Sequence, residues 1–244
     1  MSINPRDLLN KKDLNKQINF DEIKLDNISI DDLNYLGDNY DNFINLNSLL
    51  NQVSSCQISD AFNEIAHRSG VISKIKSINN LKVWGRIFTS KTDSDDWGTI
   101  TIAIDKASLG DVLFVEVSDM DASIWGELAS VCAKNNGIKA TVVYGSVRDL
   151  DAILTMDYPI FACGYAPNAG KPLGLGDIGI DLNIEGMKIS QGDFIFGDET
   201  GVVIIPKQFF KEVMLETLKI KIKEQNIIDL INSGKSLSQI VGLD

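Results

Sequence analysis

The pattern of apolar and polar residues predicts alternating strands and helices from about residue 49 onward. Apolar runs of strand length lie at 83–89, 112–117, 141–144 and 160–163. Apolar residues recur at helical spacing at 59–68, 99–106 and 127–136. Short strands separated by glycine-containing turns continue to Ile205, and Pro206 opens a long helix over 207–232. This order predicts an α/β fold in which helices pack around a central sheet, rather than a regular doubly wound fold.

The chain before this region has no sustained periodicity. Residues 1–47 are rich in Asn and Asp and hold only scattered apolar residues. We therefore expect an N-terminal polar extension over 1–47 and one folded domain over 48–244. Small apolar anchors such as Leu8 and Ile28 leave two alternatives open, a loosely ordered extension or a strap onto a neighbouring subunit.

Net charge and hydropathy narrow the range of partners. A formal net charge of −11 repels the phosphates of nucleic acids, so direct nucleic-acid binding is disfavoured. No run approaches the roughly 20 apolar residues that a membrane span needs, and residues 1–16 are too polar for a signal peptide. We expect a cytoplasmic protein with neither a nucleic-acid nor a membrane partner.

Cysteine and histidine offer little chemistry in this chain. The cysteines are widely spaced and form no CxxC pair, which favours buried free thiols over a metal or redox centre; they are Cys56, Cys132 and Cys163. The single histidine, His67, lies near the end of the first predicted helix, between the expected cap Ser59 and the expected end at Gly70. A surface or capping role is favoured for it, so catalysis must rest mainly on carboxylates, arginine, lysine and backbone amides.

The segment Gly-Leu-Gly-Asp-Ile-Gly at 174–179 has the spelling of a dinucleotide-binding loop. That fingerprint requires a buried strand before it and a helix after it. Here a loop-like segment precedes it, and residues 180–184 alternate like a strand. The context favours a turn-rich loop, and we expect no nucleotide site.

A helix start at Gly126-Glu127-Leu128-Ala129 is the first candidate for substrate binding. The free N–H groups of a first helical turn, together with the helix dipole, favour an anion, and a glycine lets that anion approach. These residues offer a place for a substrate carboxylate. By itself, however, a glycine before a helix more often marks a simple cap.

The adjacent pair Arg148-Asp149 is the second candidate, because it directly follows the predicted strand at 141–144. Strand ends are where α/β proteins commonly place their sites. An arginine forks toward carbonyl or carboxylate oxygens, and an ionised aspartate is a hard oxygen ligand for Mg²⁺. Spacing alone favours a surface ion pair or a capping aspartate.

Five spaced blocks of the sequence resemble, in the same order, those of the RraA-like family, which includes 4-hydroxy-4-methyl-2-oxoglutarate (HMG/CHA) aldolases. They are Gly-Asp-Val-Leu-Phe-Val at 110–115, Trp-Gly-Glu-Leu-Ala at 125–129, Val-Tyr-Gly-Ser-Val-Arg-Asp at 143–149, Pro-Ile-Phe-Ala at 159–162 and the run from Gly192 to Pro206. The resemblance extends from roughly residue 53 to 234. It implies a β/β/α swivelling-domain-like (RraA-like) sandwich, assembled as a homotrimer or hexamer with active sites between subunits.

The resemblance also implies roles for both candidates. The amides of the helix start, Gly126 to Ala129, are implied to hold the carboxylate of a pyruvyl substrate. Arg148 is implied to polarise the 2-oxo group, and Asp149 to anchor a divalent metal, Mg²⁺ or Mn²⁺, often through water.

A glutamate on the terminal helix completes the implied site. Glu224 interrupts a mainly apolar stripe whose members are four and three residues apart: Val213, Thr217, Ile220, Ile227 and Ile231. In the family, a glutamate from the neighbouring subunit's terminal helix approaches the metal site, and Glu224 is the candidate. A glutamate at the edge of the stripe, paired with Lys221 or Lys223, explains the pattern equally well.

Two positions depart from the family pattern. Family aldolases usually carry an acidic residue three positions after the metal-binding aspartate, where this chain has Ala152 beside Asp151. The block at 159–162 often continues with arginine, where this chain has Cys163. These departures bear on the substrate and on catalysis.

The resemblance implies a divalent-metal-dependent class II pyruvate aldolase, a carbon–carbon lyase that cleaves 4-hydroxy-2-oxo acids, decarboxylates oxaloacetate, or does both through a pyruvate enolate. One alternative is a non-catalytic RraA-type regulator that binds ribonuclease E or RNA helicases, with which the net charge is compatible. Another is a lyase for a larger 2-oxo acid, to which the extension and Ala152 point.

Overall fold

The computed structural model describes residues 50–243, and the chain divides into two compact units. One unit comprises residues 54–214. The described residues 50–53 and 215–243 belong to the other unit. The expected extension over 1–47 lies outside the described residues and stays a prediction.

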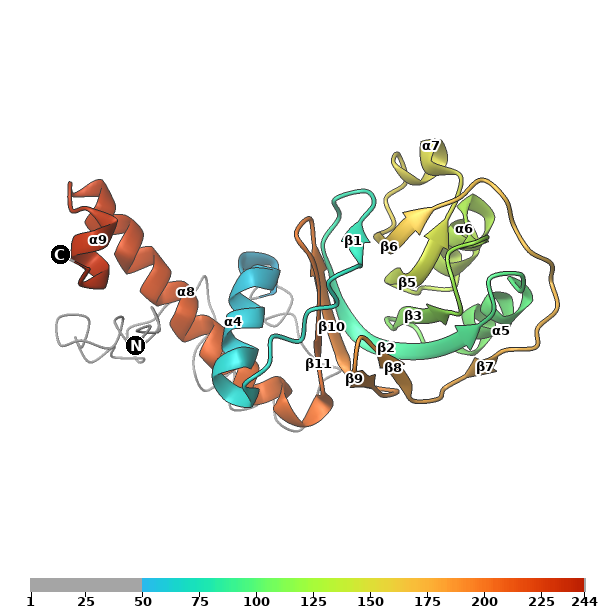
Figure 1. The fold of residues 1–244 in the computed structure, drawn as a ribbon, viewed down its shortest axis with the longest axis horizontal. Helices are drawn as coiled ribbons and strands as arrows, with labels where there is room; N and C mark the ends of the chain where they lie inside the picture. Colours follow the sequence, from blue (N-terminus) through green and yellow to red (C-terminus); the bar gives the residue numbers. More distant parts are fainter. Residues whose placement is uncertain (1–49, 244) are drawn as a thin grey trace. The chain divides into compact units, whose positions relative to one another are not determined.

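The first unit is built on a mixed sheet that has nine strands within the described residues (Figure 1). These are β1 (Lys76–Ser77), β2 (Val83–Thr92), β3 (Val112–Val117), β4 (Ser123–Trp125), β5 (Ala140–Val147), β6 (Ile160–Tyr165), β7 (Asp177–Ile178), β10 (Phe194–Asp198) and β11 (Gly201–Ile205). The main path runs β1-β6-β5-β3-β2-β10-β11, while β4 pairs with β5 and β7 with β2. Because β1 at one end lies near β11 at the other, the sheet is nearly closed.

The centre of this sheet is parallel and buried on both faces. β2, β3, β5 and β6 run parallel to one another, so their carboxyl ends share one edge. β3 is continuously apolar over its first four residues, as expected for a parallel strand covered on both sides. The short strand β4 joins β5 at the carboxyl edge, with Ser123 opposite Ser146. This edge is where a site is expected in such a sheet.

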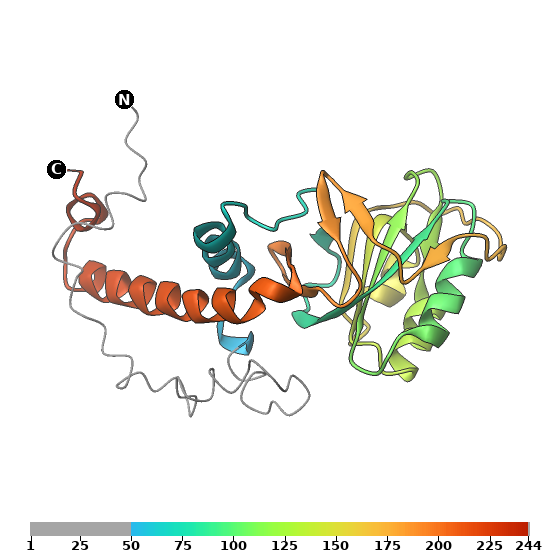
Figure 2. The ribbon, with the colours of Figure 1, turned by 90° about the horizontal axis from the view of Figure 1, so that it is seen from below.

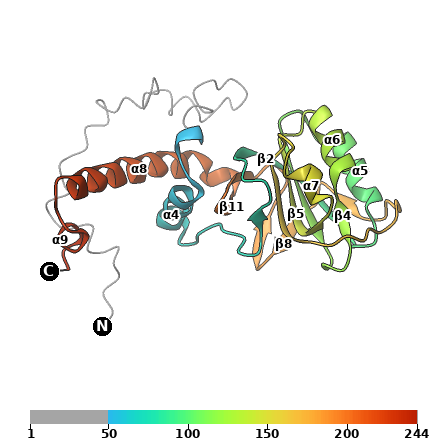
Figure 3. The same ribbon diagram turned by 90° about the horizontal axis from the view of Figure 1, so that it is seen from above.

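Helices cover one face of the sheet, and a hairpin packs on the other. α5 (Gly98–Lys106), α6 (Glu127–Asn135) and the single turn α7 (Leu150–Ile153) lie together on the first face (Figures 2 and 3). Their core includes Ile104, Leu113, Trp125, Val143 and Ile153. The separate hairpin of β8 (Leu182–Ile184) and β9 (Met187–Ile189) packs against the opposite face, with Phe114 and Phe161 in that core. The expected α/β arrangement, with helices around a central sheet, is confirmed.

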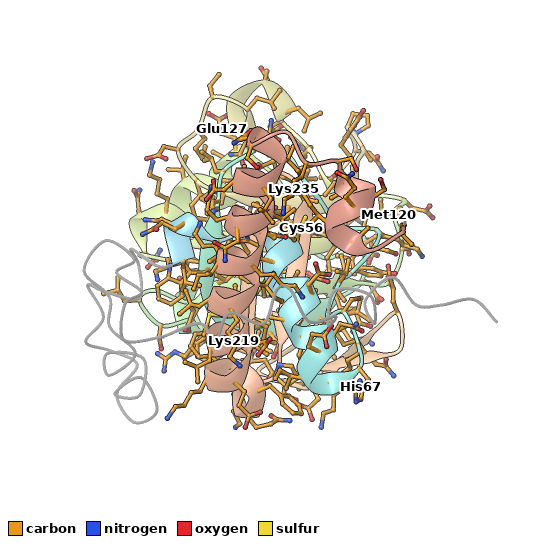
Figure 4. All side chains as sticks on the ribbon, turned by 90° about the vertical axis from the view of Figure 1, so that its left-hand side faces the viewer. Cys56, His67, Met120, Glu127, Lys219 and Lys235 are labelled. Atoms are coloured by element: carbon orange, nitrogen blue, oxygen red, sulfur yellow. The ribbon has the colours of Figure 1, made fainter. Side chains whose placement is uncertain are left out.

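The first helix begins earlier than the sequence suggested. α4 spans Ser55–Ala66, and its cap is Ser54 rather than Ser59. Ser54 Oγ accepts from the Gln57 N–H and the Gln57 side chain accepts from the Ser54 N–H, a capping box that fixes the start of the helix. The helix ends at His67, a left-handed C-cap with φ 54°, so the expected capping role of this residue is confirmed (Figure 4).

Two cysteines contradict the prediction of buried thiols. All three are free, but Cys56 near the start of α4 and Cys132 on α6 are exposed, and Cys163 on β6 is half-buried. Each exposed thiol follows from the helical face on which it lies, because neighbouring residues such as Phe62 and Ala133 take the core positions.

The chain continues from β11 through a short 3₁₀ turn η3 (Lys207–Phe209) into α8 (Phe210–Asn232), followed by α9 (Leu237–Val241). The residues of α8 in the first unit are largely buried, with Phe210 stacked on Phe194 at 3.9 Å between ring centroids. In its later half, Glu224 and Ile231 are exposed. Among the described residues, no helix has the length and apolar character needed to cross a membrane.

Candidate functional site

The carboxyl end of β5 holds Arg148 and Asp149 against the start of α6. The Arg148 N–H donates to the Trp125 carbonyl at 2.9 Å, which ties the end of β5 to the end of β4. Asp149 then adopts a left-handed conformation, with φ 57° and ψ 44°, and begins α7. Few non-glycine residues adopt this conformation, although aspartate is among those that tolerate it. The turn directs the Asp149 side chain toward α6.

Gly126 and Asp149 make the closest contact of this arrangement. Asp149 Oδ2 accepts a hydrogen bond from the Glu127 N–H at 3.1 Å, so it caps α6 in place of a side chain from Gly126. A Cβ atom built on Gly126 would lie 2.4 Å from Asp149 Oδ2 and 3.0 Å from Arg148 Cγ. The Gly126 backbone is extended, which any residue adopts. Glycine is therefore required at position 126 because a side chain there would collide with Arg148 and Asp149.

The two charged side chains contact each other directly. Arg148 Nε lies 3.1 Å from Asp149 Oδ1, and the side chains are 41% and 32% exposed. An ion pair this exposed adds little to stability. The contact uses Nε alone, so the two terminal nitrogens of the guanidinium remain as further hydrogen-bond donors on a residue that lines the adjoining cavity. The first turn of α6 likewise leaves the N–H groups of Leu128 and Ala129 without partners inside the helix.

These groups open into a cavity of about 300 Å³ between α5 and α6. Its lining residues are Trp97, Ile100, Thr101, Ile104, Ser123, Ile124, Trp125, Gly126, Leu128, Ala129, Cys132, Arg148, Asp149 and Ala169. The cavity is mostly apolar, with its two charged residues at the tip of α6. An apolar cavity with a few convergent polar groups is the usual form of a small-molecule site.

Most of the candidate residues are brought together here. Gly126, Leu128, Ala129, Arg148 and Asp149 all line the cavity, whereas Glu127 contributes its N–H to Asp149 and its side chain is exposed. The geometry thus joins two motifs that are about twenty residues apart in sequence.

Glu224 is not part of this cavity in a single chain. It lies on α8 in the other compact unit, and its expected approach from a neighbouring subunit stays a prediction. Of the departures from the family pattern, Ala152 lies on α7 and the adjacent Asp151 is exposed, outside the cavity lining.

Sequence reasoning missed Asp96, a buried carboxylate next to the cavity-lining residue Trp97. Its oxygens accept hydrogen bonds from five groups: the N–H groups of Gly98, Leu173, Gly174 and Leu175 and the hydroxyl of Thr99. Burial alone would raise the pKa of Asp96, but these hydrogen bonds hold that pKa well below its usual range. Asp96 therefore joins the start of α5 to the segment 173–175.

Close packing and backbone conformation explain the glycines at 174–179. The loop wraps around Asp96, and a Cβ atom on Gly176 would lie 2.2 Å from the Lys91 carbonyl oxygen. Asp177 and Ile178 then pair with β2 as the strand β7. Gly176 therefore serves close packing, whereas Gly174 and Gly179 adopt positive φ values of 68° and 69° that favour glycine. The strands β7 and β8 follow this loop, and not the helix that a dinucleotide fold requires.

Asp149 is the one carboxylate among the residues that line the cavity. Within residues 50–243, no group of three or more His, Cys, Asp or Glu side chains is placed to hold a metal ion by itself. Mg²⁺, however, commonly takes one or two carboxylates and completes its shell with water and substrate oxygens. A single carboxylate, Asp149, therefore suits a cation such as Mg²⁺ that keeps several water ligands. It does not suit a cation that needs all its ligands from protein side chains.

The sequence profile of a known family, RraA-like (Aldolase/RraA), matches residues 55–204. The chain belongs to the RraA-like family. The matched range contains every residue of the cavity lining and Asp96, and it ends before Glu224.

Individual RraA-like relatives agree with this assignment. An uncharacterised protein of Methanocaldococcus jannaschii is 37% identical over 168 residues, which span 68% of this chain and 81% of the relative. A protein of Halalkalibacterium halodurans, provisionally named 4-hydroxy-4-methyl-2-oxoglutarate aldolase, is 34% identical over 164 residues, 66% of this chain and 77% of the relative. The crystal structure of an uncharacterised protein from Pseudomonas syringae pv. tomato superposes with a TM-score of 0.71 at 28% identity, covering 81% of this chain and 94% of that one.

Proposed function

We propose that this RraA-like protein is a divalent-metal-dependent lyase that cleaves a carbon–carbon bond of a 2-oxo acid and releases pyruvate. Its substrates are 4-hydroxy-2-oxo acids, oxaloacetate, or both. The observation that carries the proposal is the contact between the Arg148–Asp149 pair and the start of α6, at one end of a cavity of small-molecule size. It brings the first N–H groups of a helix, an arginine and a carboxylate to one point.

Binding begins at the helix start. The substrate carboxylate accepts hydrogen bonds from the free N–H groups of Leu128 and Ala129, where the helix dipole also favours negative charge. The absence of a side chain at Gly126 leaves room for the Arg148–Asp149 pair beside these N–H groups. The adjacent 2-oxo oxygen then faces the guanidinium of Arg148.

In the retro-aldol reaction, the bond between C3 and C4 breaks and its electron pair moves into the C2–C3 bond. Negative charge develops on the 2-oxo oxygen, and Arg148 stabilises it because its guanidinium is already oriented by Asp149. A divalent cation held by Asp149 supplies Lewis-acid polarisation of the 2-oxo group when bound. Protonation of C3 completes pyruvate, and the C4 fragment leaves as an aldehyde or ketone.

The C4 hydroxyl must lose a proton as its carbon becomes a carbonyl. No histidine lines the cavity, so the acceptor is a carboxylate or a water beside one. Glu224 from the α8 helix of a second copy is our candidate for that carboxylate. Decarboxylation of oxaloacetate passes through the same enolate, with carbon dioxide leaving from C4.

The test is pyruvate release from 4-hydroxy-4-methyl-2-oxoglutarate, 4-hydroxy-2-oxohexanoate and oxaloacetate, measured in a coupled assay with Mg²⁺ or Mn²⁺ and with a chelator. We expect metal-dependent release and a fall in kcat/KM of about 100-fold or more for Asp149→Asn, since this substitution removes the charge that holds the cation. Asp151→Asn is the matched control, because this carboxylate is exposed and outside the cavity. It should stay within about twofold of wild type.

Two results would contradict the proposal. One is the absence of pyruvate release from all three substrates with either metal. The other is an equal loss in Asp149→Asn and Asp151→Asn, which would show that the position of the carboxylate in the cavity is irrelevant.

A further inference from the structure

The peptide group that joins Gly126 to Glu127 is held at both of its ends. Its N–H donates to Asp149 Oδ2 at 3.1 Å. Its carbonyl accepts from Ser130 twice, from the backbone N–H at 3.1 Å and from the side-chain Oγ at 2.8 Å. The first of these two bonds is the ordinary hydrogen bond of an α-helix, whereas the second depends on the serine hydroxyl.

The hydroxyl of Ser130 is itself oriented by a tryptophan. The indole N–H of Trp125 donates to Ser130 Oγ at 2.8 Å, and an indole N–H can only donate. The hydroxyl proton of Ser130 is therefore directed at the Gly126 carbonyl, and the two hydrogen bonds form a chain from Trp125 to Gly126. Trp125 is 1% exposed and Ser130 0%, so water does not compete for these groups.

The planarity of the peptide group connects this chain to the carboxylate of Asp149. A peptide group is rigid, so a rotation that moves its carbonyl moves its N–H as well. Gly126 has no Cβ atom to restrict that rotation. Loss of the Ser130 hydroxyl therefore frees the peptide group to turn, and the Glu127 N–H turns away from Asp149 Oδ2 with it.

Trp125 also holds the other member of the charged pair. Its carbonyl accepts from the Arg148 N–H at 2.9 Å, so this one residue contacts Arg148 through its backbone and Ser130 through its side chain. Ser130 is not among the residues that line the cavity. Any effect of Ser130 on a ligand in the cavity must therefore pass through Trp125 and the Gly126 carbonyl.

We propose that Ser130, oriented by Trp125, is a positioning residue that directs the Glu127 N–H and thereby fixes the place of the Asp149 carboxylate. This inference rests on the proposed function for the identity of the ligands, a 2-oxo acid at the first turn of α6 and a divalent cation at Asp149. The hydrogen-bond chain itself belongs to the folded protein and is tested with and without those ligands.

Ser130→Ala is the variant that removes the hydroxyl, and Tyr158→Phe is its matched control. The hydroxyl of Tyr158 forms a buried hydrogen bond of the same length, 2.8 Å, with Thr141 Oγ1, and neither residue lines the cavity. Each variant loses buried hydrogen bonding, so both should lower the melting temperature. Only Ser130→Ala should alter the site.

Crystal structures of the wild-type protein and of both variants test the positioning without a ligand. The distance from Glu127 N to Asp149 Oδ2 is 3.1 Å in the wild type. We expect it to exceed about 3.5 Å, beyond a hydrogen bond, in Ser130→Ala and to stay unchanged in Tyr158→Phe. A Ser130→Ala structure that keeps the wild-type contact would overturn the proposal.

Ser130→Cys takes the place of the alanine variant if that variant does not fold. Its thiol fills the same space and is a weak hydrogen-bond donor and acceptor, so the same lengthening is expected.

Calorimetric titration with oxalate in the presence of Mg²⁺ measures the effect on binding. We expect the affinity of Ser130→Ala to fall about tenfold, because a small displacement of binding groups is costly, and that of Tyr158→Phe to stay within about twofold of wild type. Equal losses in the two variants, or no loss in Ser130→Ala, would contradict the positioning role.

Turnover separates this inference from the proposed function. Unchanged pyruvate release in Ser130→Ala, with release lost in Asp149→Asn, would leave the lyase in place and overturn the positioning role. Weaker oxalate binding in Ser130→Ala, without pyruvate release by the wild type, would support the positioning role and contradict the lyase. If the wild type binds no oxalate, the proposed function fails and the crystal structures decide on Ser130.

Discussion

At the scale of single residues, the site depends on one position that has no side chain and one that has an unusual backbone. Gly126 is the N-cap residue of α6 and has no side chain with which to cap it. Asp149, in a left-handed conformation at the start of α7, caps α6 instead by accepting from the Glu127 N–H. Each needs the other, because any Cβ atom on Gly126 would enter the space of the Asp149 carboxylate. The pair is therefore positioned by sterics as much as by charge.

Gly126→Ala should consequently impair the reaction far more than the fold. The added methyl group displaces the Arg148–Asp149 pair, and a displacement of about 1 Å costs about 100-fold in rate, so we expect kcat/KM to fall by that amount. Thermal unfolding should shift only slightly, since the Gly126 backbone suits alanine. The measurements are pyruvate release and a melting curve.

Gly164→Ala is the matched control for this substitution. A Cβ atom there meets only the end of the flexible Met120 side chain, at 2.9 Å, and Gly164 does not line the cavity. Should both alanine variants lose activity equally, or neither lose any, the close contact at Gly126 would have no special role.

The residues at the tip of the cavity were recognisable from sequence, but Asp96 was not. Gly126 to Ala129 and Arg148-Asp149 lie in contiguous motifs at element ends, where their chemistry is visible. Asp96 lies in a loop rich in Ser and Asp, and three of its partners are backbone amides more than seventy residues later. Nearly every residue carries a backbone N–H group, so a partner of this kind cannot be recognised from the residue types in a sequence.

At the scale of elements, Asp96 holds α5 and the segment 173–175 together. Asp96→Asn replaces one acceptor oxygen by an NH₂ group that cannot accept from these buried donors. We expect a loss of about 2–4 kcal/mol in the free energy of unfolding, measured by denaturant titration at pH 7. Asp95→Asn, at the neighbouring exposed position, is the control and should change it by less than about 0.5 kcal/mol.

The pH dependence of this loss gives a second readout. The folded-state pKa of Asp96 is depressed, so its contribution is fully present above the unfolded value of about 3.9 and is lost as the pH falls through the folded value. The difference between wild type and Asp96→Asn should be constant from pH 5 to 8 and narrow below about pH 4. A difference that grows on acidification would be inconsistent with a carboxylate held ionised by hydrogen bonds.

The longer elements could be predicted from periodicity. The errors occur where two residues could cap the same helix or where tertiary pairing decides the structure. The bounds 112–117 were confirmed because a run of this short length, rich in valine and preceded by Gly110, favours a buried strand over a helix. The start of α4 was misplaced by four residues, since Ser59 and Ser54 are both acceptable caps and only the Gln57 side chain favours Ser54. The three-residue strand β4 was missed, because its pairing with β5 is set by the tertiary fold.

At the scale of the whole molecule, the family match and the cavity coincide in one compact unit. Residues 54–214 hold the sheet, the helix tip and the Arg148–Asp149 pair, whereas Glu224 belongs to the other unit. The proposed function therefore requires that a 2-oxo acid and a divalent cation bind together within this unit, at the start of α6.

Oxalate is the best probe of this joint binding, because it is a planar mimic of pyruvate enolate that does not react. The measurement is a crystal structure of the protein with oxalate and Mg²⁺. We predict that oxalate lies at the start of α6, with one carboxylate on the amides of Leu128 and Ala129, Arg148 facing its oxygens and the cation beside Asp149. Oxalate and Mg²⁺ bound elsewhere, or a cavity without either at saturating concentrations, would contradict the account.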